Sequence, residues 1–242
     1  MNTRSQVVCA WAGLVGVALI LVALVVAGYI PAPRASATPA EMAAFYRDGT
    51  FPIRLGLLIG LIGTAGWAML VSVVWVQLNR IEGPRPVMAS LQAIAGGACY
   101  VFLTLFIVLL AAAAFRPERA PESTQLLHDL GWFMAFLAAV PFVLQAVATG
   151  VAVLGDQAER PAYPRWLGYV GIWVGVLLAP GDVLLFFHTG PFAYDGVISY
   201  WIPLFAFGGW MAVLSWGALR AARGEAGEPA TVAVPAEGEL AR

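Results

Sequence analysis

The chain has 242 residues, of which 61% are hydrophobic and 11% charged, with a mean hydropathy of +0.82, a formal net charge of −1 and no lysine. A soluble domain carries about 25% charged residues, so this sequence has too little polar surface to face water on all sides and requires a bilayer as its solvent. The lack of a basic tract argues against nucleic acid as a partner. The spacing of Cys9 and Cys99 predicts neither a disulfide framework nor a metal site.

Six apolar segments are each long enough to cross a membrane as a helix, which takes about 20 residues. We therefore predict an all-α, polytopic membrane bundle with spans at 7–30, 53–78, 87–114, 130–154, 166–188 and 199–219. The alternative for the first segment is a removed leader, because an A-x-A pattern follows it at 35–37. One domain covers 1–222, and 223–242 is predicted to be a disordered cytoplasmic tail without hydrophobic periodicity.

Local patterns predict how several of these segments begin or break. Thr38-Pro39-Ala40-Glu41 supplies a capping hydroxyl, a first-turn proline and a first-turn acid, which predicts a short interfacial helix through Tyr46. Pro141 predicts a kink near the middle of the fourth span. Pro180-Gly181 predicts a break in the fifth span.

The arginines predict the orientation of the bundle. One side of the predicted topology carries Arg4, Arg80, Arg85, Arg160, Arg165, Arg220 and Arg223, and the other carries Arg34, Arg47, Arg54, Arg116 and Arg119 among acids. The positive-inside rule makes the first side cytoplasmic. We therefore predict a multi-pass protein of the cytoplasmic membrane with both termini in the cytoplasm.

Ionisable side chains within or beside the spans gather at the predicted outer end. We take eight residues there as candidates for ligand binding: Arg54, Glu122, His128, Asp129, Asp182, His188, Tyr194 and Asp195. Residues three and four apart share a helical face, so Glu122 lies with Asp129, while His128 occupies another face.

Each candidate has a functional and a structural interpretation. Asp182 lies within a span, where a carboxylate is costly, so it either faces a hydrated outward vestibule or caps the helix broken at Pro180. His128 and His188 could form a zinc or iron site with carboxylates, but no ligand spacing supports it, so we predict no metal and no cofactor. Arg54 either snorkels to phosphate or holds an anionic group.

Glycines spaced by four mark two close-packing helix faces. Gly56 and Gly60 form one, and Gly171 and Gly175 form the other. Small residues at this spacing let helix backbones approach closely in membranes. These faces predict close packing and allow association with further copies of the chain or with other proteins.

Two long segments carry a resemblance to known sequences. The segments YPRWLGYVGIWVGVLLAPGDVLLFFHTGPFAYDGVISYWIP and FRPERAPESTQLLHDLGW resemble those of a group of uncharacterised bacterial six-helix membrane proteins. The resemblance spans about Pro39 to Arg220 and implies a single six-helix domain, without an activity. Glycine tends to occupy the position of Asp182 in that group, which argues against Asp182 as a shared catalytic group.

Four functions fit these features. The leading hypothesis is binding of a small apolar or amphipathic molecule in an outward-facing vestibule. The alternatives are a membrane enzyme acting on a lipid or terpenoid-like substrate, a proton-coupled carrier using Asp182, and an accessory membrane subunit. The sequence leaves open whether the chain is an enzyme.

Overall fold

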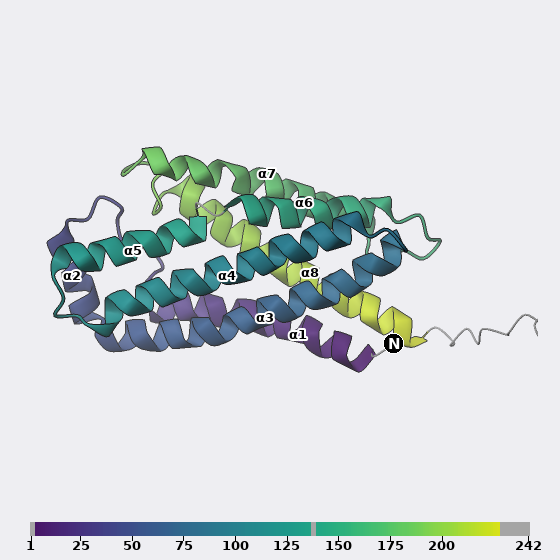
Figure 1. Cartoon of the computed structure of the whole chain (residues 1–242), viewed down its shortest axis with the longest axis horizontal. Helices are drawn as coiled ribbons and strands as arrows, with labels where there is room; N and C mark the ends of the chain where they lie inside the picture. The colour runs from purple at the N-terminus through teal and green to yellow at the C-terminus, as the bar shows by residue number, and fades with distance from the viewer. Residues whose placement is uncertain (1–2, 137–138, 228–242) are drawn as a thin grey trace, which may run out of the picture.

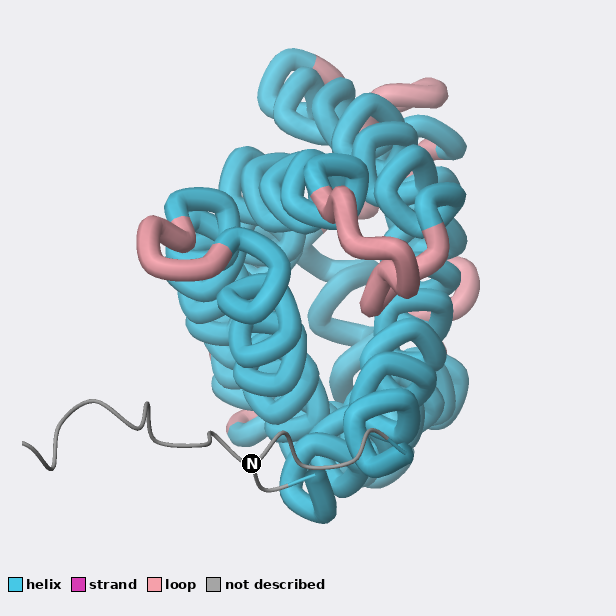
Figure 2. Tube along the Cα trace, turned by 90° about the vertical axis from the view of Figure 1, so that its right-hand side faces the viewer, coloured by secondary structure: helices cyan, strands magenta, loops and turns pink. Residues whose placement is uncertain are grey.

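The computed structural model describes residues 3–136 and 139–227, and these form an elongated bundle of helices joined by loops (Figure 1). No strand occurs in the described ranges, as the view along the bundle shows (Figure 2). The elements in chain order are α1 (Thr3–Val26), α2 (Pro39–Asp48), α3 (Thr50–Glu82), α4 (Val87–Phe115), α5 (Pro121–Phe136), α6 (Ala139–Gly155), α7 (Arg165–Leu178), the 3₁₀ helix η1 (Ala179–Phe186), the π-helix η2 (Val197–Trp201) and α8 (Ile202–Gly227).

Among the residues that the structure describes, six helical segments are long and apolar enough to cross a membrane, which confirms the predicted all-α bundle of six transmembrane helices. They are Thr3–Val26, Thr50–Glu82, Val87–Phe115, Pro121–Gly155, Arg165–Phe186 and Val197–Glu225. Large apolar side chains such as Ile94 and Phe205 are exposed on the bundle surface. Such a surface suits lipid, and helices satisfy their backbone hydrogen bonds internally, so the chain has the architecture of a multi-pass membrane protein.

The bundle has two distinct ends. Thr3 and Gly227 lie at the same end, which we call the termini end, together with the turns at 83–86 and 156–164 (Figure 1). The opposite end, which we call the α2 end, holds α2 and the loops at 116–120 and 187–196. Helix α8 crosses the bundle obliquely and contacts α1, α3 and α7.

The fifth span is interrupted at the predicted proline, so the single helix predicted at 166–188 is replaced by α7 and η1. In the fourth span, residues 137–138 between α5 and α6 lie outside the described ranges. Pro141 is the third residue after this gap, and the kink predicted there stays a prediction. Pro180 lies in the first turn of η1, directly after α7 ends. The break in the fifth span lies against the fourth span: a Cβ built on Gly181 would lie 3.9 Å from both the Phe136 carbonyl oxygen and the Ala139 Cβ.

Glycines bring α1 and α3 into direct backbone contact. A Cβ built on Gly66 would lie 2.3 Å from the Ala12 carbonyl oxygen, and one on Gly16 would lie 2.8 Å from the Gly63 carbonyl oxygen. Gly56 is equally close, with a built Cβ 2.6 Å from the Ala23 carbonyl oxygen. No side chain fits these gaps, so small residues set the separation of the two helices.

The α6–α7 contact follows the same rule. A built Cβ on Gly171 would lie 2.7 Å from the Ala146 carbonyl oxygen, and one on Gly175 would lie 2.7 Å from a Val147 methyl carbon. The predicted glycine faces therefore pack against helices of the same chain. Association through these faces with other chains stays a prediction.

The segment between α1 and α3 is fixed at both of its ends. Gly28 has φ +71°, and hydrogen bonds from Gly28 N to Val25 O and from Tyr29 N to Leu24 O form a Schellman motif that ends α1. The capping box of α2 forms as predicted, with the Glu41 backbone N–H donating to the Thr38 hydroxyl. Hydrogen bonds from the Thr38 backbone N–H and hydroxyl hold the pKa of Glu41 below its ordinary value.

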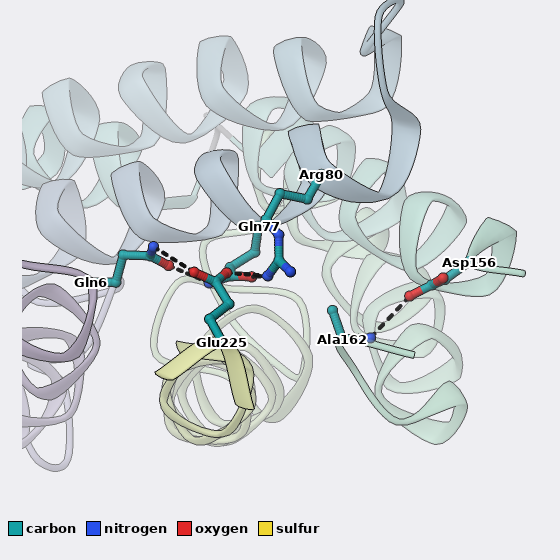
Figure 3. Close-up of polar contacts among 6 residues, drawn as sticks. All are labelled: Gln6, Gln77, Arg80, Asp156, Ala162 and Glu225. Carbon is teal, nitrogen blue, oxygen red and sulfur yellow. Dashed lines mark hydrogen bonds and ion pairs between the residues drawn. The ribbon is translucent and has the colours of Figure 1, made fainter. Parts of the chain in front are cut away.

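The last helix extends beyond the predicted domain end at residue 222. Helix α8 continues to Gly227, because Glu225 pairs with Arg80 of α3 and accepts a hydrogen bond from Gln6 of α1 at 3.0 Å (Figure 3). Gln77 joins the same cluster through Gln6 and Arg80. The cluster ties α1, α3 and α8 together at the termini end. The rest of the predicted tail, 228–242, lies outside the described residues.

Candidate functional site

A buried chain of hydrogen bonds at the α2 end is centred on His128. His128 is fully buried on α5, and its Nδ1 lies 2.9 Å from the Tyr46 hydroxyl of α2. The Trp132 indole donates to His128 Nε2 at 2.9 Å, and the Tyr29 hydroxyl donates to that of Tyr46 at 3.1 Å. The Tyr200 hydroxyl donates to the backbone oxygen of Tyr29. Four segments, α2, α5, η2 and the end of α1, thus meet through polar side chains.

The donors in this chain define the protonation state of His128. An indole N–H donates only, so Nε2 of His128 must accept and carries no proton. A neutral imidazole then holds its proton on Nδ1, which donates to the Tyr46 hydroxyl. Both ring nitrogens are therefore occupied. A metal or a second proton at Nε2 would have to displace the Trp132 N–H.

Trp132 links this chain to the neighbouring aromatic rings. Its indole stacks between Phe136, at 5.6 Å between ring centroids, and Tyr194, at 5.7 Å. The Tyr194 hydroxyl forms a long hydrogen bond of 3.4 Å to Asp129 Oδ1. The loop that follows η1 is thereby held on α5. Asp129 is the only carboxylate of the predicted set that bonds directly to this cluster within the described residues.

The tyrosines of the cluster are neutral hydroxyls. Burial raises the pKa of Tyr29 and of Tyr46 above the ordinary range. Burial also raises the pKa of Tyr194, and the nearby Asp129 charge adds to this shift. At physiological pH these groups keep their protons, so the cluster presents no phenolate base.

An apolar cavity of about 120 Å³ lies directly beside this cluster, between the helices and partly open to the outside of the bundle. Its wall is formed by Ile20, Leu24, Leu103, Phe106, Trp132, Ala135, Phe136, Ala139, Phe142, Leu178, Gly181, Tyr200, Pro203, Leu204 and Phe207. The polar atoms of Trp132 and Tyr200 are committed to His128 and to the Tyr29 backbone. A buried water needs about 2–4 polar partners, and this wall offers none, so the cavity suits an apolar occupant.

Asp182 stands at the edge of the cavity, next to the lining residue Gly181. Its Oδ1 is buried and has no hydrogen-bond partner among the described residues, and its carboxylate faces the backbone amide of Ala139 at the start of α6. The capping interpretation concerned the helix broken at Pro180, whereas the amide that Asp182 faces belongs to α6. The cavity beside it is apolar, whereas a hydrated vestibule was expected there.

The structure separates the eight predicted residues into three groups. His128, Asp129 and Tyr194 meet in the cluster, and His188 is an exposed residue of the loop that follows η1. Asp182 belongs to the cavity edge. The others are Arg54, Glu122 and Asp195, for none of which the described contacts include a bond to His128.

Arg54 has a role that the sequence did not predict. It donates from Nε to the Ala114 carbonyl at 3.1 Å and from Nη2 to the Phe115 carbonyl at 2.9 Å. These bonds satisfy orphan carbonyls at the C-terminus of α4, where a cation is also favoured by the helix dipole. Glu122 is exposed on α5. Within the described residues, no group of three or more His, Cys, Asp or Glu side chains could hold a metal ion.

The residues that complete the site were not among the predicted set. Tyr29, Tyr46, Trp132 and Tyr200 supply most of the hydrogen bonds and the cavity wall. The one local feature that could have pointed to Tyr29 is the glycine before it. Gly28 adopts a left-handed φ that ends α1 and directs the following residues back onto the bundle. His128 and Trp132 are four residues apart, the spacing of two side chains on one helical face.

Comparisons with protein families, with curated proteins and with solved structures give no match for this chain. The resemblance to bacterial six-helix membrane proteins therefore stays a prediction.

Proposed function

We propose that this chain is a membrane protein that binds a small apolar or amphipathic molecule in the cavity beside Trp132. The observation that supports the proposal is a partly open space of about 120 Å³ with an apolar wall and no polar atom left to hold water. A dry cavity of about 150 Å³ lined by aliphatic and aromatic side chains is large enough to bind benzene or xenon. A ring or a short alkyl segment is thus the natural size for an occupant.

The hydrogen-bonded cluster around His128 fixes the shape of the adjoining cavity. Trp132 is held by its stacking partners and by His128, and Tyr200 is held by the Tyr29 backbone. Aromatic walls fixed in this way are preorganised, which lowers the entropy cost of binding. Asp182 at the edge offers a polar group to an amphipathic ligand, whose apolar part would enter the cavity.

The arginine distribution supports placement of the chain in the cytoplasmic membrane with both termini in the cytoplasm. The α2 end, with the cluster and the cavity beside it, would then face the outer leaflet. A molecule dissolved in the outer leaflet would then have a shorter route to the cavity than one in the inner leaflet.

Photolabelling of the protein in detergent tests the proposal. The probe is octanol bearing an alkyl diazirine, which has the apolar chain and single polar group that the site suits. Labelled peptides should come from α5, α6 and α8 around Phe136, Phe142 and Leu204, and excess unlabelled octanol should compete with the probe. Labelling that spreads over exposed positions such as Ile94, without competition, would remove the support for the cavity as a binding site.

A matched pair of variants sharpens this test. Ala135→Leu enlarges a side chain in the cavity wall and should suppress the competed labelling. Ala98→Leu makes the same change at another half-buried alanine, on α4 and outside the wall, and should leave the labelling unchanged. Equal loss in both variants would point to a general effect on folding.

A further inference from the structure

A second hollow lies between α3 and α4, on the surface of the bundle, and shares no lining residue with the cavity beside Trp132. Its volume is about 220 Å³. Arg54 stands at one end, and its walls include Leu58 and Leu61 of α3 and Val108, Ala111 and Phe115 of α4. Leu58, Val108 and Phe115 are exposed, so the hollow is a surface groove. We infer that this groove binds the acyl chain of a phospholipid whose anionic headgroup is held by Arg54.

The Arg54 guanidinium is held in place while keeping donors for a ligand. Its bonds to the Ala114 and Phe115 carbonyls use two of the five N–H donors of a guanidinium. The side chain is exposed, and the one ion pair in the described part of the chain joins Arg80 to Glu225, so no described carboxylate neutralises Arg54. A positioned, unneutralised guanidinium matches phosphate oxygens well, because it presents parallel N–H donors.

A second arginine adds positive charge at the same helix end. Arg119 donates from Nη1 to the Ala112 carbonyl at 3.0 Å, one turn or less from the carbonyls that Arg54 contacts. Two cations at the C-terminus of α4 favour a headgroup with net negative charge. A zwitterionic headgroup would bring its own cation towards them.

The groove has the dimensions of an acyl-chain segment below a headgroup. Arg54 is the fifth residue of α3, and Leu61 is seven residues further along that helix. At ~1.5 Å per residue, the groove extends ~10 Å from the guanidinium along the helix axis. Arg54 at the end of the span would contact the headgroup of a phospholipid, and the apolar groove leading away from it would contact an acyl chain. This inference stands independently of the ligand proposed for the cavity beside Trp132.

Native mass spectrometry tests the inference on protein taken from vesicles of equal phosphatidylglycerol and phosphatidylcholine. The unaltered chain should retain phosphatidylglycerol in preference to phosphatidylcholine. Arg54→Gln removes the charge, and Ala111→Phe fills the groove while leaving the α4 cap in place. Arg54→Gln should lower the retained phosphatidylglycerol by about tenfold, the effect of losing one charge-assisted contact. Ala111→Phe should also lower it, because the acyl chain loses its place in the groove.

Arg47→Gln is the matched control, because Arg47 is an exposed arginine at the same end that does not line the groove. It should retain phosphatidylglycerol as the unaltered chain does. Equal retention of the two lipids by the unaltered chain would overturn the inference, as would equal losses in Arg47→Gln and Arg54→Gln. A loss in Arg54→Gln without one in Ala111→Phe would also overturn it, because the headgroup would then bind without the groove.

Discussion

The Trp132 indole N–H donates to Nε2 of His128 across 2.9 Å, one turn apart on α5. This bond occupies the nitrogen that a proton carrier or a metal ligand would need. The bond to Tyr46 occupies the other nitrogen. His128 therefore holds α2 and Trp132 of the cavity wall in position. The candidate site is the apolar cavity, and the buried imidazole has a structural role beside it.

Replacing His128 should destabilise the bundle. In His128→Leu the buried Trp132 N–H loses its acceptor, and leaving one buried donor unpaired costs about 1–3 kcal/mol. Thermal melting of the detergent-solubilised protein should show the loss as a lower Tm. His188→Leu is the control, because His188 is exposed, and it should melt like the unaltered chain. Equal melting of both variants would contradict the structural role of His128.

The glycine contact between α1 and α3 predicts opposite outcomes for two identical changes. Gly97→Ala adds a methyl group where nothing lies within 4 Å, and alanine in a helix is favoured over glycine by about 0.5–1 kcal/mol. Gly66→Ala pushes a methyl group onto the Ala12 carbonyl and should cost about 1–3 kcal/mol through overpacking. Melting should therefore fall for Gly66→Ala and hold or rise for Gly97→Ala. The same Tm for both would show that the contact is incidental.

Much of the fold can be predicted from local chemistry. Six apolar runs fix the spans by length, because a bilayer core has a set thickness. The cap of α2 follows from Thr38 and Glu41, and the break in the fifth span follows from Pro180. Each of these features is determined by residues that are close together in the sequence, so it can be predicted without knowing which helices pack together.

The site could be predicted only in part, because it depends on which distant helices meet. His128 and Asp129 stand out as ionisable groups near a span, but their partners Tyr46 and Tyr194 come from segments far along the chain. The sequence gives no contact between α2 and α5. The contacts of Arg54 could not be predicted for the same reason, because its acceptors are 60 and 61 residues further along the chain, at the C-terminus of α4.

The topology predicts where two reporters will lie. A reporter fused to the C-terminus should be cytoplasmic, because the arginine-rich termini end is retained there. A reporter inserted at Glu118, in the loop at the α2 end, should be external. Alkaline phosphatase and green fluorescent protein fusions read the two compartments. Reversed signals would invert the proposed orientation. Signals from both reporters on the same side of the membrane would contradict the six-span topology.

Asp182 provides a test of the proton-coupled carrier. After Cys9 and Cys99 are replaced by alanine, Asp182→Cys should react with a membrane-impermeant thiol reagent faster than Leu178→Cys, because Leu178 is buried in the apolar wall. Thr189→Cys, at an exposed position of the same end, calibrates the reagent. If Thr189→Cys reacts while Asp182→Cys is inert, water does not reach Asp182 and the carrier hypothesis fails.

The central claim is that the cavity beside Trp132 holds a small apolar or amphipathic molecule. The most direct measurement is a cryo-electron microscopy map of the protein purified together with lipids of the membrane in which it is made. The account predicts density that belongs to no side chain between Phe136, Phe142 and Leu204, with Trp132 still bonded to His128. An empty cavity, or one closed by rearranged side chains, would contradict it.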